Sequence, residues 1–416
     1  MREFKINPVQ PEGCGAAVKG VYPMADYMFP SINELSESTE TSKYQRQEVV
    51  TQQAEKLLQK FAALGMEVKM LDCHFNSFAL LIKLRLGETV TQKMVRDCWK
   101  DIELEMEDPV EFKDDEQNEK IIWIAIKDEM RPVIALKDIL RSREFQDSTS
   151  GLAFGAGVDL FGGKLIIDLK DIRNLLVIGV TGSGKSVFLS NIILSILFRA
   201  RPEEVQFIFF DFKGVDLPLF NDIPHQIRPS VKDAGTALEE LRRLEKQAKK
   251  RLEALEKAKA GDIDAFNEIS GEKMAHVVLI IDEYMSLVQG RKQSGEMTGK
   301  EFVRIIQFLA STTAQTGIHL VLATQRPSAN VVTKEISEAI PHRISFYVMT
   351  GVDSKIAINR TGAQRLLGAG DMIYADIRSE KGTHAQAAYV TDSDIDKVIR
   401  FCRDQWEYTP EYPSFD

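Results

Sequence analysis

A glycine-rich loop constrains the fold of this chain more than any other feature of its sequence. Residues 179–186 read GVTGSGKS and fit the pattern G-x-x-x-x-G-K-[ST]. The apolar run 175–178 before the loop predicts a buried strand, and residues 187–198 after it predict a helix. Glycines allow backbone N–H groups to turn toward phosphate oxygens, and the N-terminus of a helix attracts their negative charge. The chain is therefore expected to bind a nucleotide through an α/β fold.

The loop assigns individual roles to its residues, with ATP and Mg²⁺ as the predicted cofactors. Lys185 is expected to reach the β- and γ-phosphates, and the Ser186 hydroxyl to bind Mg²⁺. The residues expected to contact the nucleotide are Gly179, Val180, Thr181, Gly182, Ser183, Gly184, Lys185, Ser186 and Val187.

Two further apolar runs end in polar side chains that complete a candidate catalytic site. Residues 277–281 lead into Asp282 and Glu283, and residues 319–324 lead into Gln325. Ligands of open α/β sheets bind at the carboxyl ends of the strands. We expect Asp282 to hold Mg²⁺ through water, Glu283 to polarise the attacking water, and Gln325 to contact the γ-phosphate or that water. An acidic pair or an amide at a strand end is also common without function, but the upstream loop favours ATP hydrolysis.

The length of 416 residues predicts more than one domain. Residues 1–44 are rich in Pro, Gly, Ser and Thr and are expected to be flexible. Residues 45–144 predict a small α+β domain, with helices at 44–64 and 90–99 and strands at 66–71, 78–86 and 121–126. Residues 145–416 predict a RecA-like α/β ATPase domain with a mainly parallel sheet, because short apolar runs alternate with helices there. Those runs lie at 175–179, 207–211, 277–282, 319–324 and 343–348, and residues 148–157 are expected to form a loop.

Charge leaves the class of partner open. The net charge is −9, but residues 101–120 alone carry −8, so the rest of the chain is nearly neutral. The segment 237–259 has leucines at helical spacing and many basic residues, which predicts an amphipathic helix with a solvated face or, alternatively, a basic ridge facing DNA or a partner. The cysteines and histidines show no metal-ligand spacing. Because no apolar run is long enough to span a membrane, we expect a cytoplasmic protein without direct membrane insertion.

Several blocks in order resemble the FtsK/SpoIIIE family of DNA translocases. GVTGSGKS is similar to the family's P-loop, and Asp211-Phe212-Lys213 stands where the family has an Asp-Pro-Lys turn. IIDE, ending at Glu283, is similar to its Walker B motif. The blocks 317–333 (GIHLVLATQRPSANVVT) and 365–374 (RLLGAGDMIY) are similar to two further signatures, and YMFPSINEL resembles the stretch before the small domain. The resemblance covers about residues 25–400.

The resemblance implies a hexameric ring with double-stranded DNA passing through it. Asn330, Thr333 and Lys334 are then candidates for contacting DNA, although a surface role is the ordinary one for a lysine. A cation from the neighbouring subunit commonly completes such sites. The resemblance places an arginine at Arg343, with Arg360 as the second candidate and a structural role for Arg343 as the alternative. The sequence departs from the family at Tyr284-Met285-Ser286, where the family often has Leu-Ala-Asp, and at Lys355, where it usually has Arg.

The leading hypothesis is therefore an ATP-driven translocase of double-stranded DNA. A second hypothesis keeps the motor and changes the cargo, as in ring ATPases of conjugative DNA transfer or of type VII-like protein secretion. A third is a nucleotide-gated scaffold without enzymatic activity, which the intact Lys185, Asp282 and Glu283 disfavour. A stimulation of phosphate release by DNA would separate the three.

Overall fold

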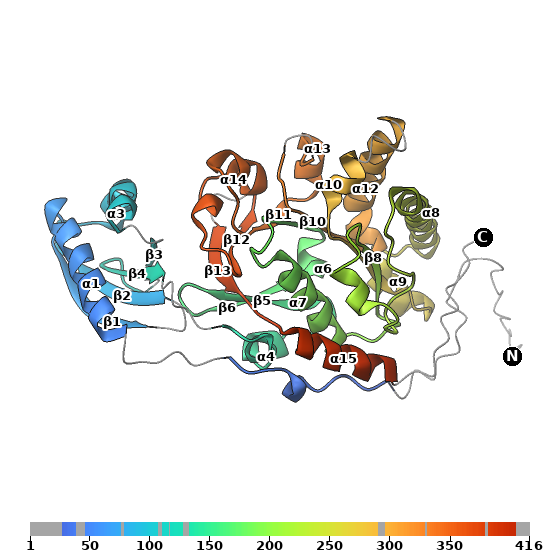
Figure 1. Ribbon diagram of the computed structural model, residues 1–416, viewed down its shortest axis with the longest axis horizontal. Coiled ribbons are helices and arrows are strands. Elements are labelled where there is room, and N and C mark those ends of the chain that lie inside the picture. Colours follow the sequence, from blue (N-terminus) through green and yellow to red (C-terminus); the bar gives the residue numbers. More distant parts are fainter. Residues whose placement is uncertain are drawn as a thin grey trace, which may run out of the picture. The chain divides into compact units, whose positions relative to one another are not determined.

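A computed structural model of the chain describes residues 27–38, 46–75, 79–106, 110–115, 117–127, 133–289, 296–328, 331–378 and 382–404. The chain divides into two compact units. Unit 1 comprises Met1–Phe29, Ala200–Leu322 and Ile399–Asp416, and unit 2 comprises Pro30–Arg199 and Ala323–Val398. Figure 1 shows the helices and strands of both units, most of them labelled.

Unit 1 contains three parallel strands in the order β10-β9-β8. They are β8 (Val205–Phe210), β9 (His276–Ile281) and β10 (Ile318–Thr324), whose last two residues belong to unit 2. In the register, Phe207 lies opposite Val278, and Leu279 lies opposite Leu320. Almost every residue of these strands is buried, as expected for a parallel sheet covered on both faces.

Unit 1 contains several helices, of which α8 (Ala234–Ala258) is the one that the sequence predicts with bounds. The others are α9 (Ile263–Ser270), α10 (Tyr284–Gln289) and α12 (Glu296–Thr316), with the short 3-10 turn η4 at Leu217–Phe220. Helix α8 begins after Asp233, whose carboxylate accepts the Thr236 N–H, and it packs its leucine-rich side against α12. The predicted helix at 237–259 is confirmed.

Unit 2 contains a larger sheet in the order β6-β5-β13-β12-β11-β7. These strands are β5 (Ala153–Asp159), β6 (Lys164–Asp168), β7 (Leu175–Ile178), β11 (His342–Ser345), β12 (Asp371–Asp376) and β13 (Gly382–Ala387). Strands β11 and β7 are parallel, and the other neighbours are antiparallel. Its helices are α4 (Leu136–Leu140), α5 (Arg143–Gln146), α6 (Leu169–Ile172), α7 (Lys185–Leu197), α13 (Lys334–Ala339), α14 (Gly351–Ile358), the turn η5 (Ala363–Arg365) and α15 (Asp392–Asp404), which continues into unit 1.

The expectation of a loop at 148–157 is wrong from Ala153 onward, because strand β5 begins there. The signal was obscured by glycine, which is typical of turns but also occurs where a strand needs a close neighbour. A Cβ added at Gly155 would lie 2.7 Å from Cγ2 of Ile139, so α4 can approach the strand only because that side chain is missing. The parallel strands were predicted, whereas the antiparallel strands β5, β6, β12 and β13 were not.

A second, four-stranded antiparallel sheet lies in unit 2, with the order β1-β2-β4-β3. Its strands are β1 (Val68–Phe75), β2 (Ala79–Leu86), β3 (Val110–Asp114) and β4 (Ile121–Lys127), and its helices are α1 (Arg46–Ala63), α2 (Gln92–Asp97) and α3 (Trp99–Met106). Leu57 and Phe61 of α1 pack with Ile82 and Ile124 into a separate apolar core. The acidic segment 101–120, to which the sequence assigned no element, supplies part of α3 and all of β3.

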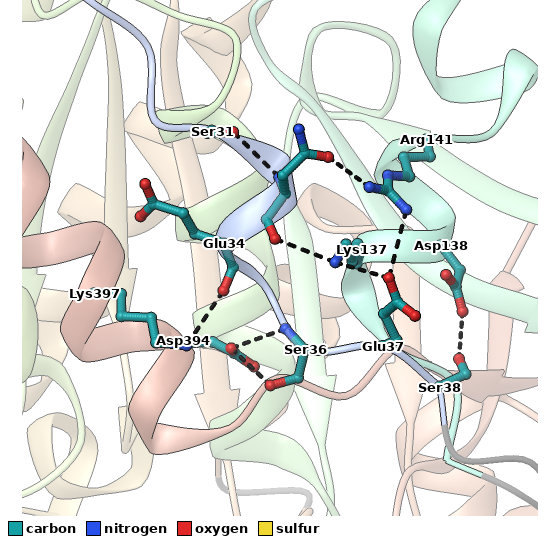
Figure 2. A network of polar contacts seen from close by, with 11 residues as sticks. Ser31, Glu34, Ser36, Glu37, Ser38, Lys137, Asp138, Arg141, Asp394 and Lys397 are labelled. Carbon is teal, nitrogen blue, oxygen red and sulfur yellow. Dashed lines mark hydrogen bonds and ion pairs between the residues drawn. The ribbon is translucent and has the colours of Figure 1, made fainter.

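A polar network fixes residues 31–38 against α4 and α15 (Figure 2). The N–H and the hydroxyl of Ser36 both donate to Asp394, at 2.9 Å each. The Lys137 ammonium lies 3.1 Å from the Glu37 carboxylate, and the Ser38 hydroxyl donates to Asp138. This part of the segment expected to be flexible therefore has defined contacts.

Among the helices that the structure describes, none combines the length and the apolar character that crossing a bilayer requires.

Candidate nucleotide-binding and catalytic site

The glycine-rich loop lies between β7 and α7, as the sequence predicts. Both elements are deeply buried, and Lys185 begins the helix with only 4% of its surface exposed. Gly182 and Gly184 have φ values of +78° and +111°, a region that favours glycine. A Cβ at Gly179 would lie 2.5 Å from the Ser183 hydroxyl oxygen, so this position also needs glycine.

Backbone hydrogen bonds hold the loop in place. The Gly179 N–H donates to the carbonyl of Thr324 at 3.2 Å, and the Val180 N–H donates to that of Tyr347 at 3.1 Å. The Ser183 hydroxyl donates to the carbonyl of Val180 at 2.7 Å, which closes the turn. The ends of β10 and β11 therefore position the loop.

Gln325 lies within reach of the loop. The Thr181 hydroxyl donates to the Gln325 side-chain oxygen at 3.0 Å, across a separation of 144 residues. This contact was not predicted, because the sequence assigned Thr181 only to the nucleotide. Through this hydrogen bond, a movement of the loop could displace Gln325 at the end of β10.

The backbone of the loop leaves space at its turn. A Cβ added at Gly182 would meet nothing within 4 Å, so space is open at the turn. The loop also places a lysine and a serine at the first two positions of α7. The assignments of Lys185 to phosphate and Ser186 to Mg²⁺ remain predictions that this geometry supports.

In unit 1, two carboxylates follow strand β9. Asp282 is 1% exposed and Glu283 is 8% exposed. The Asp282 N–H donates to the carbonyl of Phe210 at 3.0 Å, which ties the strand end to β8. Tyr284, at a position where the family often has leucine, is fully buried, and burial raises the pKa of its hydroxyl.

A tight turn after β8 places a lysine beside these carboxylates. The buried Asp211 carboxylate accepts five backbone N–H bonds at 2.9–3.1 Å, from residues 213–217. The Lys213 ammonium then lies 3.6 Å from Asp282 and 3.9 Å from Glu283. The sequence signal for this turn was the Asp-Phe-Lys block. The block indicated a turn but did not indicate which residues Lys213 would contact.

Lys213→Ala is expected to lower, by a few fold, the Mg²⁺ concentration at which ATP binding is half-maximal. The Lys213 ammonium and a metal ion would both interact with the Asp282 carboxylate, so the lysine would weaken metal binding. The effect is expected to be small, because the lysine is 40% exposed and water screens its charge. The measurement is a titration of fluorescent ATP binding against Mg²⁺. Lys232→Ala is the matched control, because Lys232 lies beside Gly214 of the same turn. An unchanged Mg²⁺ dependence in the Lys213 variant would contradict this role.

The donor atoms fit Mg²⁺ better than they fit a transition metal. Ser186 offers a hydroxyl and Asp282 a carboxylate, and Mg²⁺ prefers oxygen ligands shared with substrate phosphates. In the part of the chain that the structure describes, no group of three or more His, Cys, Asp and Glu residues could hold a metal ion.

Arg343 is buried and bonded within its own chain. It is 1% exposed, and its guanidinium donates to carbonyl oxygens of Ile356 and Ala357, both at 2.9 Å, and to Ser337. Burial lowers the pKa of Arg343 to about 10, so it remains charged at neutral pH. These contacts favour the structural alternative, because the charged group is held by its own chain, and a role in a neighbouring active site stays a prediction.

Arg343→Ala is expected to cost about 3 kcal/mol of unfolding free energy, because several buried carbonyls lose their donor. The measurement is thermal or denaturant unfolding. Arg360→Ala is the comparison, since Arg360 is only partly buried and was the second candidate for the trans-acting role. If Arg343→Ala unfolds normally but loses all ATPase activity, the structural assignment fails.

Two of the candidates for contacting DNA, Thr333 and Lys334, lie at the start of α13. The Thr333 hydroxyl accepts the Ile336 N–H at 3.4 Å and caps α13. The Lys334 side chain is 84% exposed and lies 3.8 Å from Glu338. Asn330 lies outside the described residues. The structure thus leaves Lys334 accessible to a phosphate, and its assignment stays a prediction.

Several basic residues of α8 pair with acids. Arg242 makes two bonds to Glu301, at 2.8 and 2.9 Å, and Arg243 pairs with Glu240 at 2.6 Å. Glu245 accepts from both Lys249 and Arg304, and these bonds hold its pKa down at about 2. This pairing favours the solvated-face interpretation over a ridge that binds DNA.

Known proteins resemble this chain over most of its length. The DNA translocase FtsK of Caldanaerobacter subterraneus subsp. tengcongensis is 31% identical over 92% of this chain and 53% of its own. The DNA translocase SftA of Bacillus subtilis is 37% identical over 68% of this chain and 30% of its own. The chain thus spans about half, or less, of the length of these relatives.

Solved structures share its fold. The pCW3 conjugation coupling protein TcpA, in a monomer form with ATPγS, has a TM-score of 0.57 at 20% identity and covers 84% of this chain and 99% of its own. The cytoplasmic domain of the Thermomonospora curvata type VII secretion ATPase EccC has a TM-score of 0.56 at 20% identity, over 68% of this chain and 36% of its own. These matches confirm the predicted α/β fold.

A model of the FtsK/SpoIIIE family matches part of this chain. It covers residues 135–329, which include the P-loop, the Asp211 turn, the two carboxylates and Gln325. With relatives that match both inside and outside this range, the chain belongs to the FtsK/SpoIIIE family.

Proposed function

We propose that this chain is a motor that uses ATP hydrolysis to move along double-stranded DNA. The observation that carries the proposal is the formed P-loop, with Lys185 at the start of α7, in a chain whose relatives are named DNA translocases. The buried pair Asp282 and Glu283 supports hydrolysis in addition to binding.

The chemistry assigned to each residue follows from its charge. Lys185 would neutralise the β- and γ-phosphate oxygens, while Ser186 and Asp282 would hold Mg²⁺. Bound Mg²⁺ would supply positive charge to the same oxygens. Glu283 would accept a proton from water as that water attacks the γ-phosphorus and the bond to the ADP oxygen breaks. Gln325, bonded to Thr181, would register the loss of the γ-phosphate.

The proposal includes assembly as a hexameric ring around the DNA. The family resemblance supports this assembly, and Lys334, whose side chain is 84% exposed, is a candidate for contact with a phosphate. A cation from a neighbouring subunit remains part of the proposal, now with Arg360 as its first candidate.

The deciding experiment measures the ATPase rate with and without duplex DNA across a series of protein concentrations. The expected result is stimulation by DNA, with a rate per subunit that rises with concentration as rings form. Lys185→Ala is the inactive control. A rate that is independent of DNA at all concentrations would favour protein secretion as the work of the motor, and the absence of hydrolysis would favour the scaffold.

A further inference from the structure

A buried charge cluster joins the small sheet to the large sheet of unit 2. The Lys127 ammonium, at the end of β4, forms an ion pair with the Asp371 carboxylate at the start of β12, and both side chains are fully buried. His384 of β13 completes the cluster, with its Nε2 2.7 Å from Asp371 and 3.2 Å from Lys127. Its Nδ1 lies 3.4 Å from Glu111 of β3.

Such a cluster is a costly way to hold two sheets together. Burying two charges costs desolvation energy that apolar side chains of similar volume would avoid, so the pair is weak evidence for stability alone. What the charges add is geometric specificity. The second oxygen of Asp371 accepts the Leu367 N–H at 2.8 Å, so the carboxylate also shapes the turn formed by residues 367–371.

That turn touches the P-loop directly. The Gly370 N–H donates to the carbonyl of Ser183 at 2.8 Å. A Cβ added at Gly184 would lie 2.8 Å from the Gly370 nitrogen, and one added at Gly370 would lie 2.7 Å from the Gln386 amide nitrogen. The two backbones therefore meet with no room for a side chain, and a shift in one must move the other.

We propose that Lys127 and Asp371 are positioning residues for the P-loop, through which the small sheet and the bound nucleotide influence each other. The path runs from β4 through the ion pair and the 367–371 turn to Ser183. This inference rests on the proposed binding of ATP. Coupling between two sites is reciprocal. Nucleotide binding therefore slows hydrogen exchange at β4, and loss of the ion pair weakens ATP binding by about tenfold.

The test is hydrogen exchange of the full chain with and without a slowly hydrolysed ATP analogue, together with the Kd of ATP. In the wild type, the analogue slows exchange at the P-loop and also at β4. In Lys127→Met, protection of the P-loop remains at saturating analogue, protection of β4 disappears, and the Kd of ATP rises about tenfold. Met keeps the length of the side chain and removes its charge.

Two further variants separate coupling from folding. Lys127→Met with Asp371→Asn removes both charges, so its thermal stability returns toward that of the wild type while β4 stays unprotected. Arg365→Ala is the matched control, because Arg365 also bridges to the small domain, at 3.3 Å from Glu103, but is exposed. It keeps the wild-type protection and ATP affinity.

The outcomes are distinguishable. A wild-type chain that fails to bind the analogue contradicts the proposed function. Binding that protects the P-loop but never β4 overturns this inference alone, as does a double variant with wild-type protection of β4.

Discussion

Lys185→Ala is expected to abolish ATP turnover by preventing binding, whereas Glu283→Gln is expected to abolish turnover and keep ATP bound. Lys185 supplies the charge that faces the β- and γ-phosphates, so its loss removes ground-state affinity. Glu283 is needed only to activate water, a contribution of about 10²–10⁴ in rate. Gln has the same size and still fills the site, in which Glu283 is 8% exposed.

The two effects are separated by measuring the Kd of ATP and the single-turnover rate of each variant. Asp282→Asn serves as a third variant, because a lost metal contact should raise the Mg²⁺ requirement and not only the barrier. If Glu283→Gln hydrolyses ATP at close to the wild-type rate, another group positions the water.

Binding to duplex DNA is expected to fall steeply with salt and to depend little on base sequence. A protein that contacts 6–10 phosphates loses about 10³–10⁵ in affinity between 50 and 200 mM salt, because bound counterions are released from the DNA. Phosphate contacts carry no sequence information, so duplexes of different composition should bind alike. Binding should also require ATP or an analogue if a ring must close around the DNA.

The measurement is the Kd for two unrelated duplexes over a series of salt concentrations. Lys334→Ala should reduce the magnitude of the salt slope by about one, as the loss of one phosphate contact predicts. Lys246→Ala is the control, since Lys246 is an exposed lysine on α8, where Arg242, Arg243 and Lys249 pair with acids, and it should leave the slope unchanged. Affinity that ignores salt and selects one sequence would contradict this mode of binding.

Structural elements that form from a continuous stretch of sequence were predicted well. The strand, loop and helix of the P-loop lie where the sequence places them, because glycine spacing and continuous apolar runs specify local backbone geometry directly. The carboxylates Asp282 and Glu283 follow β9 for the same reason. Local pattern misled where one residue type has two uses, as with the glycines of β5.

Contacts between distant residues were decided by the tertiary structure alone. As an arginine, Arg343 has a side chain that could serve in catalysis, but it is buried among carbonyl groups of its own chain. Burial depends on the residues that pack around it, which the local sequence does not specify. Lys213 is directed at Asp282 by a turn that the buried Asp211 organises, and Lys127 meets Asp371 across more than half of the chain. The sequence by itself determined which chemical groups the protein carries and the local elements that hold them. The contact partners of those groups were decided by strand pairing and desolvation. Both act between segments that are far apart in the sequence, and no periodic pattern in the sequence reveals which segments will meet.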